Sequence, residues 1–258
     1  MRLVTWNVNS LKMRLPRVLE FLGQHAPDVA CLQETKCERD AFPVAELADA
    51  GYRAVHHSGG RWAGVAILAR EGLALAEAAA GLPGEVRAEE ARWIEADVDG
   101  VRVASTYVVN GRAVGSETFA EKLSFLDAMI ARAGELRGRD VVIAGDFNVA
   151  PADVDVYDPA AFAGATHVTA EERSRLARML EAGGLVDAHV ALHGPEAQQF
   201  TWWDYRQGHF HRGLGLRIDL LLLGGTLPAG LERVGIERDF RKGSKPSDHA
   251  PLVADLRR

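Results

Sequence analysis

Ten short apolar runs are the feature that most constrains the fold of this chain. Each run has the length and the side-chain pattern that are typical of a β-strand. The runs span residues 2–8, 28–33, 52–57, 63–69, 92–98, 101–107, 140–145, 217–223, 232–237 and 250–256. Asp99 and Gly100 separate two of them, and an Asp-Gly pair is a strong hairpin signal. At least one pair of strands is therefore expected to be antiparallel.

Three segments carry helix signals. Apolar residues recur at helical spacing within 15–22 and 119–130, and a third helix begins at the capping box of Thr169 and Glu172. Ten strands with so few helices are too many for a simple doubly wound sheet, so two stacked sheets flanked by helices fit better. With 258 residues, 47% of them hydrophobic, the chain is expected to form one α/β domain over residues 1–258.

Charge and composition limit the class of protein. The net charge of −6 argues mildly against a surface that binds nucleic acid everywhere, although Lys and Arg gather in residues 10–17, 205–217 and 238–245. No apolar stretch approaches the roughly 20 residues of a membrane span, and no signal peptide is evident. A cytoplasmic location without a membrane partner is therefore expected. Cys31 and Cys37 form neither a disulfide framework nor a metal-binding spacing.

Polar side chains gather at the ends of the expected strands. They are Asn7, Asn9, Glu34, Tyr107, Asp146, Asn148, Asp219, Asp248 and His249. Taken singly, most fit a structural role, since an Asn at a strand end is usually a turn former. Asp219 fits less well, because an unpaired carboxylate within an apolar strand costs several kcal/mol. Loops at neighbouring strand ends can converge on one pocket, so the whole set predicts a functional site at a sheet edge.

The residue types in this set favour hydrolysis of a phosphate ester. Carboxylate and amide oxygens without a Cys ligand suit a hard cation such as Mg²⁺ or Mn²⁺. A His can donate a hydrogen bond to a phosphoryl oxygen, and an Asp held by an Asn can take a proton from water. A divalent cation would also offset the repulsion between these acids and an anionic substrate.

Several motifs carry a family resemblance that covers essentially the whole chain. They are "TWNVNSLKMR", "CLQETK", "GDFNVAPADVDV", "WWDYR", "LRIDLLL" and "PSDHAPLV". In order and approximate spacing, the sequence resembles the exonuclease III family of DNA-repair nucleases, within the endonuclease/exonuclease/phosphatase superfamily. "GDFN" and "SDH" alone indicate only the superfamily, and the remaining motifs narrow the resemblance to exonuclease III.

The resemblance implies a fold, an activity and partners. The fold is a four-layered α/β sandwich, in which two mixed, largely antiparallel β-sheets pack face to face between helices. The activities are AP endonuclease incision 5′ to abasic sites, 3′-phosphodiesterase and 3′-phosphatase activity, and 3′→5′ exonuclease action on double-stranded DNA, all in base excision repair. One or two Mg²⁺ ions, replaceable by Mn²⁺, are implied. The expected partner is double-stranded DNA with abasic sites or blocked 3′ ends, and a monomer is expected.

The resemblance also implies residue roles. The implied metal set is Glu34, Asn7, Asp146, Asn148 and Asp248, with Glu34 as the principal ligand. The implied catalytic set is Asp146, Asn148, His249, Tyr107, Asp219 and Asn7. Asp146 would orient or deprotonate the attacking water, and Asn148 would bond both Asp146 and the scissile phosphate. Whether His249 or Asp146 is the base, and whether one or two metals act, stays open at this point.

A pocket and a DNA-facing rim complete the implied site. Trp202 and Leu216, with Ile218 close by, would enclose a flipped-out abasic sugar. The rim is expected to include Asn110, Arg112, Lys122, Arg206, Arg212, Arg241 and Lys245. Two positions depart from the family pattern: Val109 stands where a Pro is usual, and Leu216 stands where some relatives carry Trp.

Two other functions remain as alternatives. One is a superfamily phosphatase that acts on a small or lipid phosphate, which the aromatic and basic rim segments argue against. The other is a DNA-damage binder that has lost catalysis. Glu34, Asp146, Asn148 and His249 are all intact, and an inactive relative would be expected to lack at least one of them.

Overall fold

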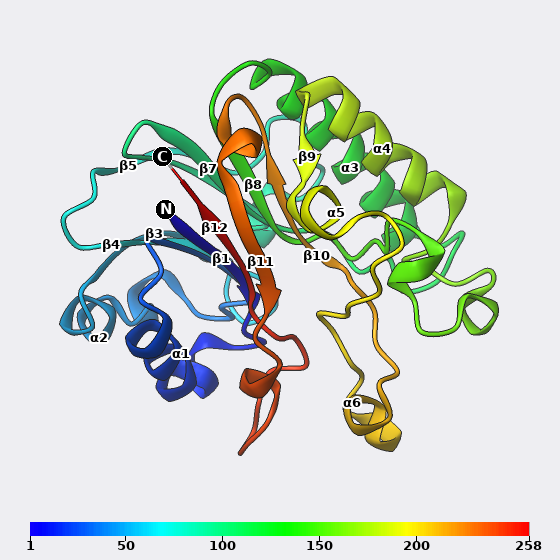
Figure 1. Cartoon of the computed structure of the whole chain (residues 1–258), viewed down its shortest axis with the longest axis horizontal. Helices are drawn as coiled ribbons and strands as arrows, with labels where there is room; N and C mark the ends of the chain where they lie inside the picture. Colours follow the sequence, from blue (N-terminus) through cyan, green and yellow to red (C-terminus); the bar gives the residue numbers. More distant parts are fainter. Residues whose placement is uncertain (258) are drawn as a thin grey trace.

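Two six-stranded β-sheets packed face to face form the centre of residues 1–257, the part of the chain that the computed structural model describes (Figure 1). The first sheet contains β1 (Arg2–Asn7), β2 (Val29–Gln33), β3 (Tyr52–His57), β4 (Val65–Arg70), β11 (Leu231–Ile236) and β12 (Leu252–Leu256). The second contains β5 (Leu75–Ala80), β6 (Trp93–Val98), β7 (Val101–Tyr107), β8 (Val141–Asp146), β9 (Val186–Asp187) and β10 (Asp219–Leu223). Their orders are β11-β12-β1-β2-β4-β3 and β5-β6-β7-β8-β10-β9.

Both sheets are mixed and mostly antiparallel. Among the strands of residues 1–257, β1 with β2 and β7 with β8 pair in parallel, and the other neighbouring pairs are antiparallel. The hairpin between β6 and β7 turns at Asp99 and Gly100, whose φ values of 47° and 82° are those of the expected tight turn. These pairings confirm the predicted two-sheet fold.

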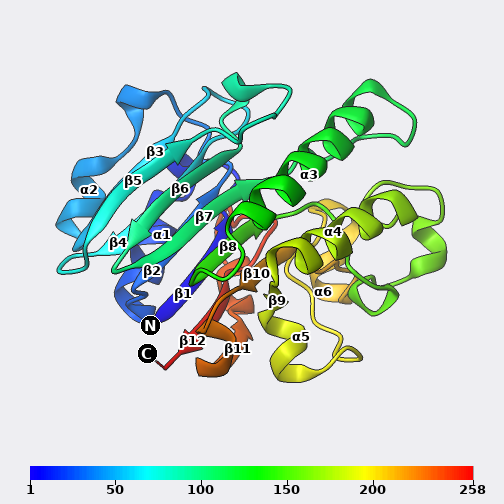
Figure 2. The ribbon, with the colours of Figure 1, turned by 90° about the horizontal axis from the view of Figure 1, so that it is seen from above.

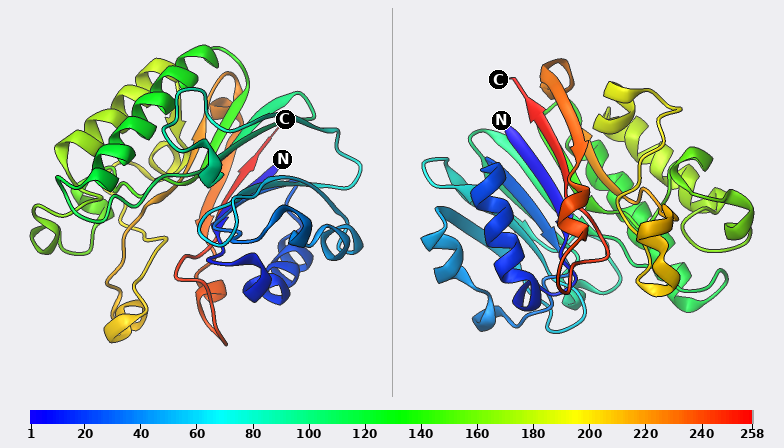
Figure 3. Two further views of the ribbon diagram at one scale, coloured as in Figure 1. Left: turned by 180° about the vertical axis from the view of Figure 1, so that it is seen from behind. Right: turned by 60° about the horizontal axis from the view of Figure 1, so that its bottom comes forward.

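Helices cover the outer surface of each sheet. They are α1 (Leu11–His25), α2 (Val44–Asp49), α3 (Glu117–Glu135), α4 (Ala170–Gly183) and α5 (Ala188–His193), whereas the short α6 (His209–Arg212) lies at the tip of a loop away from both sheets (Figure 1). Figures 2 and 3 show α1 and α2 beside one sheet and α3 and α4 beside the other. The three predicted helices are confirmed as α1, α3 and α4. The Thr169–Glu172 capping box is present at the start of α4.

Three apolar layers hold this arrangement together. Leu3, Ile67, Val103 and Val142 belong to the core between the sheets. Phe125 and Met129 of α3 pack with the outer face of the second sheet, and Val18 and Phe21 of α1 pack with the outer face of the first. Each sheet therefore buries both faces, which explains why most strands read as continuous apolar runs.

Two strands lie outside the predicted set. The segment Leu75–Ala80, β5, has the sequence LAEAAA, which lacks the β-branched residues that mark strands, and most of its side chains are exposed. The segment Val186–Asp187, β9, has only two residues. Both lie at sheet edges, where tertiary pairing rather than local sequence decides the conformation.

Candidate functional site

The functional residues stand at neighbouring strand ends, at one edge of the two sheets. Asp146 is the last residue of β8, and the sheet register places it opposite Tyr107 of β7 and Asp219 of β10. Asn7 ends β1 in the facing sheet, and Glu34 follows β2. Neighbouring strand ends thus bring together the residues that the sequence placed there.

Asn7 connects the two sheets at this edge. Its Nδ2 atom donates a hydrogen bond to Glu34 Oε1 at 2.7 Å and another to Asp146 Oδ2 at 3.0 Å. Asn7 and Asp146 are both buried. The amide therefore holds two carboxylates near each other and partly offsets their mutual repulsion.

His249 lies between the carboxylates of Asp219 and Asp146. Its Nδ1 atom lies 2.8 Å from Asp219 Oδ2, and its Nε2 atom lies 3.7 Å from Asp146 Oδ2. Burial alone would lower the pKa of His249, but the carboxylates of Asp219 and Asp146 outweigh it and raise this pKa. The imidazole is consequently cationic at neutral pH, and the buried Asp219 has the partner that the sequence required.

Burial also acts on Asp146 and Tyr107. It raises the pKa of Asp146; the His249 imidazole opposes this shift and the Asp219 carboxylate adds to it. Burial raises the pKa of Tyr107 well above its ordinary value, and the carboxylates of Glu34 and Asp146 raise it further. Tyr107 is therefore a neutral phenol that can donate a hydrogen bond.

The chain after β8 is shaped to place Asn148. Gly145 passes so close to β7 that a Cβ there would lie 1.9 Å from the Thr106 carbonyl oxygen, which leaves room for glycine only. Asn148 adopts a left-handed φ of 51°, its backbone N–H donates to Asp146 Oδ1 at 2.9 Å, and its Nδ2 donates to Val108 O at 2.9 Å. Phe147 between them is fully buried and anchors the turn.

The residues present fit a hard divalent cation. Glu34, Asp146 and His249 each offer one ligand atom, and these atoms lie within 4.8 Å of one another. Because His249 is protonated, the donors suited to a cation are the carboxylate oxygens, which Mg²⁺ and Mn²⁺ prefer. Glu34 also has a left-handed φ of 50°, and backbone strain of this kind clusters at functional sites.

These side chains line a catalytic pocket of about 150 Å³. Its lining residues are Glu34, Tyr107, Asn110, Asp146, Asn148, His167, Trp202, Ile218, Asp248 and His249. Trp202 Nε1 donates to Asp248 Oδ2 at 3.1 Å, and Asn9 Nδ2 donates to Asp248 Oδ1 at 3.0 Å. These two bonds fix both carboxylate oxygens of Asp248.

Ile218 and Leu216 were both predicted to lie at the pocket, but the structure places them differently. Ile218 lines the catalytic pocket, but Leu216 is fully buried behind it, packed with Ala150 and Val156. The backbone of Leu216 pairs with that of Trp202, which turns the Leu216 side chain into the core. Leu216 therefore supports Trp202 instead of forming the pocket wall.

His167 lines the pocket without having been predicted. Its Nδ1 atom lies 2.6 Å from the Asn148 carbonyl oxygen, and its Nε2 atom lies 3.5 Å from Asn110 Nδ2. Burial and the Lys122 cation lower the pKa of His167, so its ring is neutral. A single His in a loop between helices gives no sequence signal of such a position.

The predicted basic rim is only partly present. Arg112, Arg206, Arg212 and Lys245 are exposed, and Asn110 is exposed beside the pocket. The prediction for Lys122 was wrong: it is fully buried and ion-paired with Glu172, because α3 turns that side chain toward the loops behind Asn148. Arg241 is also buried, with its guanidinium 4.9 Å from the ring centre of Tyr205. Val109 is buried as well.

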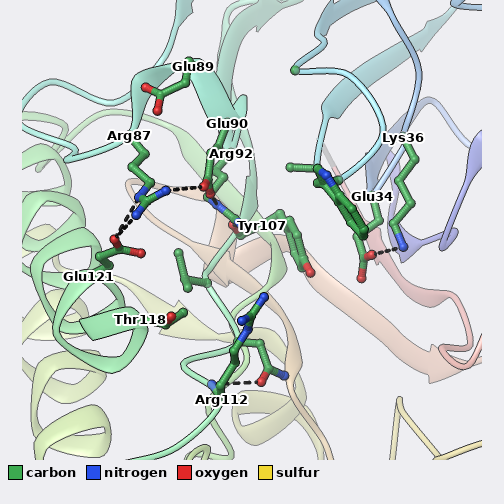
Figure 4. Close-up of a pocket in the computed structure, with 15 residues that line it drawn as sticks. Glu34, Lys36, Arg87, Glu89, Glu90, Arg92, Tyr107, Arg112, Thr118 and Glu121 are labelled. Carbon is green, nitrogen blue, oxygen red and sulfur yellow. Dashed lines mark hydrogen bonds and ion pairs between the residues drawn. The ribbon is translucent and has the colours of Figure 1, made fainter. Parts of the chain in front are cut away.

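A second, larger pocket opens beside the first. It has a volume of about 620 Å³ and shares Glu34, Tyr107 and Asn110 with the catalytic pocket. Figure 4 shows Tyr107 between the Glu34–Lys36 pair on one side and Arg87, Glu90 and Arg92 on the other. We call it the side pocket.

The buried array of Asp219, His249 and Asp146, with Glu34 completing a group that could hold a metal ion, is typical of a metal-dependent phosphoesterase on a two-sheet scaffold. Residues 4–249 match the model of the Endonuclease/Exonuclease/phosphatase family, and the chain belongs to that family, within its exonuclease III branch. It is accordingly a DNA-repair nuclease that hydrolyses phosphodiesters.

Three similar proteins illustrate the relationship. Exodeoxyribonuclease III of Haemophilus influenzae is 30% identical, with 100% of both chains covered. The 3′ phosphatase NExo from Neisseria, solved as a D146N variant bound to product DNA hairpin, is 38% identical, with a TM-score of 0.94 over 100% of both chains. An AP endonuclease from Archaeoglobus fulgidus is 34% identical, with a TM-score of 0.93 over 99% of both chains.

The helices give one further finding. In residues 1–257, none is both long enough and apolar enough to cross a membrane.

Proposed function

We propose that this protein is a Mg²⁺-dependent phosphoesterase that acts on the 3′ ends of double-stranded DNA, with incision 5′ to abasic sites as a second activity of the same site. The observation that carries the proposal is the array in which Asp219, His249, Asp146, Asn7 and Glu34 meet around the catalytic pocket. Phosphate hydrolysis requires a cationic hydrogen-bond donor, a carboxylate fixed in position to accept a proton, and a carboxylate that binds a metal ion.

Each side chain has a role that follows from its contacts. Asp146 is held by Asn7 and by the backbone of Asn148, so it is placed to orient a water molecule and accept its proton. His249 is charged and oriented by Asp219, which suits hydrogen-bond donation to a phosphoryl oxygen better than proton abstraction.

The remaining donors face the same phosphate. Tyr107 is a neutral phenol that can donate to a phosphoryl oxygen, whereas the Asn148 amide already donates to Val108 O and Asp146 Oδ2 and would have to exchange the longer of these bonds for one to the phosphate. Asp248 would take a supporting role, since it is held by Trp202 and Asn9 and lies outside the group of Glu34, Asp146 and His249 that could hold a metal ion.

Glu34 would be the main ligand of a divalent cation, with Asp146, Asn148 and the Asn7 amide nearby and Asp248 at the rim. The cation supplies charge that stabilises the anionic phosphate as it reacts. Lys36 Nζ lies 2.6 Å from Glu34 Oε2, so the carboxylate is held in place from its outer side.

Removal of the metal is expected to lower hydrolysis more than about 100-fold, because loss of metal-based charge stabilisation costs several kcal/mol. The measurement is strand cleavage after dialysis against EDTA, followed by separate addition of Mg²⁺, Mn²⁺ and Ca²⁺. Mg²⁺ or Mn²⁺ should restore activity. Undiminished cleavage in EDTA would contradict a role for the Glu34 cluster as a metal site.

Two observations favour 3′ ends as the principal substrate. The Neisseria 3′ phosphatase is more similar in identity than the Archaeoglobus AP endonuclease, at 38% against 34%. In addition, Trp202 and Ile218 line the catalytic pocket beside mostly polar residues, and Leu216 is buried behind it. A pocket lined mainly by polar groups suits a terminal phosphate at least as well as an abasic sugar.

The deciding experiment compares three labelled duplexes with Mg²⁺ and with EDTA. One carries a recessed 3′-phosphate, one a central abasic analogue, and one an undamaged recessed 3′ end. Metal-dependent phosphate release supports the principal activity, and a cut at the abasic position supports the second. No reaction on any duplex would refute the proposal and lead to a small or lipid phosphate as the substrate.

Trp202→Ala is expected to lower abasic incision about 5- to 150-fold more than phosphate release, because the apolar contact with an abasic sugar is worth about 1–3 kcal/mol. The measurement is kcat/KM on the abasic and 3′-phosphate duplexes. Trp202→Phe is the matched control: it keeps an aromatic face but loses the bond to Asp248. Equal losses on both substrates would show that Trp202 acts through Asp248 instead.

Exposed basic residues would bind the DNA backbone around the catalytic pocket. Arg112, Arg206, Arg212 and Lys245 are proposed as phosphate contacts, with Asn110 beside the scissile position. We further propose that residues 1–258 act as one domain and as a monomer. The cytoplasmic location stays a prediction.

A further inference from the structure

Three buried polar side chains lie in the core between the two sheets. They are Thr5 of β1, Gln33 of β2 and Ser105 of β7, and each is 0% exposed. They interrupt the apolar layer to which the neighbouring Cys31 and Val103 belong. An unpaired polar group in such a layer costs about 1–3 kcal/mol, so each of the three needs a hydrogen-bond partner.

Hydrogen bonds join these side chains into a link that crosses from one sheet to the other. Thr5 Oγ1 donates to Gln33 Oε1 at 3.2 Å, and Gln33 Nε2 donates to Ser105 Oγ at 3.1 Å. Ser105 Oγ donates in turn to the Leu32 carbonyl oxygen at 3.3 Å. We call Thr5, Gln33 and Ser105 the polar bridge. Through Ser105, the second sheet is bonded to both a side chain and the backbone of the first.

The polar bridge lies next to residues that form the catalytic pocket. Gln33 directly precedes Glu34, and in the register of β1 and β2 it lies opposite Asn7. Because side chains alternate along a strand, Ser105 shares a face of β7 with Tyr107. Glu34 and Tyr107 line both the catalytic pocket and the side pocket. The bridge therefore holds the strand ends from which these side chains project.

Hydrolysis needs groups from both sheets at once. Asn7 and Glu34 belong to the first sheet or follow it, whereas Tyr107 and Asp146 belong to the second. Apolar contacts between sheets are non-directional, but hydrogen bonds fix both a distance and a direction. A displacement of about 1 Å at a reacting centre can lower a rate about 100-fold. A directional link between the sheets can thus control the distance between Glu34 and Asp146.

We propose that the polar bridge positions the metal-binding carboxylate of Glu34 relative to Asp146, with Gln33 as the central positioning residue. The inference rests on the proposed roles of Glu34 and Asp146 in hydrolysis. Gln33 and Ser105 are fully buried, so they act through the residues that line the catalytic pocket and do not contact the substrate. The bridge contributes geometry more than stability, because an apolar layer of similar volume would be at least equally stable.

The test replaces the whole bridge by apolar groups of similar volume, as Thr5→Val with Gln33→Met and Ser105→Ala. No polar group of the bridge is then left unpaired, so the Tm of this triple variant should equal or exceed that of the unsubstituted protein. Single-turnover hydrolysis of duplex DNA at saturating Mg²⁺ is expected to be about 10- to 100-fold slower, as when the support of a metal ligand is removed. Kd for Mn²⁺, measured without DNA from the paramagnetic resonance signal of the free ion, should rise about 10-fold or more.

Either an unchanged rate or an unchanged Kd for Mn²⁺ in the triple variant would overturn the proposal, because the variant is expected to be fully folded. Ser105→Ala alone provides a second measurement. It breaks both bonds between the second sheet and the first and leaves Gln33 Nε2 unpaired, so it should lower the rate, the Mn²⁺ affinity and the Tm together.

Val98→Ala is the matched control for lost stability. Val98 is 0% exposed in the same core, at the end of β6 that lies beside the hairpin turn. The substitution should lower the Tm and leave both the rate and the Mn²⁺ affinity unchanged. Losses equal to those of Ser105→Ala would refute a positioning role for the bridge. Metal-dependent hydrolysis by the unsubstituted protein tests the proposed function separately.

Discussion

Asp146→Asn is expected to lower kcat by up to about 10⁴-fold, the upper range for removal of a positioned general base, while DNA affinity stays within about tenfold. The amide cannot accept the proton of the attacking water. Its oxygen can still accept the bond from the backbone of Asn148, so the loop after β8 keeps its anchor. Loss of one negative charge removes repulsion toward DNA and should leave binding unchanged or tighter.

The measurement pairs single-turnover hydrolysis with DNA binding by fluorescence anisotropy. Asp140→Asn makes the same chemical change just before the other end of β8, where Asp140 bonds Thr226, and should retain full activity. The Neisseria 3′ phosphatase was solved as a D146N variant with product DNA, so that variant of that protein binds DNA. Full activity of Asp146→Asn here would remove Asp146 from the reaction.

Lys122→Met is expected to destabilise the protein by about 3–5 kcal/mol, because it leaves the Glu172 carboxylate buried and unpaired. Both side chains are 0% exposed. Lys122 Nζ also donates to Asn148 O at 2.6 Å and to Thr166 Oγ1 at 3.1 Å, so the substitution breaks several bonds at once. Burial lowers the pKa of Lys122, and the Glu172 carboxylate opposes that shift.

For a chain of this size, the loss corresponds to a fall in Tm of about 6–20 °C, which thermal unfolding would measure. Lys242→Met is the matched control, because its partner Asp239 is 82% exposed and water screens such a pair, so it adds little to stability. The double substitution Lys122→Met with Glu172→Gln should recover part of the loss, since no buried charge remains. A fall in Tm equal to that of Lys242→Met would contradict the buried-pair explanation.

Sequence patterns anticipated the residues that stand at strand ends. Asp146 follows an apolar strand and Asp219 lies within one, so their positions depend on local periodicity that the sequence displays. The sheet register then places them opposite each other, which is a consequence of β8 and β10 pairing.

Contacts between distant segments could not be anticipated in the same way. Lys122 was expected on the surface because most lysines are exposed, and only the packing of α3 against α4 brings Glu172 to it. The position of His167 in the pocket depends on the path of its loop, and the loop sequence has no periodic pattern that would predict this path. Leu216 was expected to form part of the pocket wall. Its side chain points into the core instead, and that direction depends on the pairing of its backbone with Trp202.

The pairing of β1 with β12 sets the order in which the site can be completed during synthesis. β1 lies between β2 and β12, so this early strand has an unpaired edge until residues 252–256 have been made. His249, which joins Asp146 and Asp219, is made just before that strand. A growing chain can therefore contain Glu34, Asp146 and Asp219 and still lack the cationic donor. The site is complete only after the segment that carries His249 and β12 has been made.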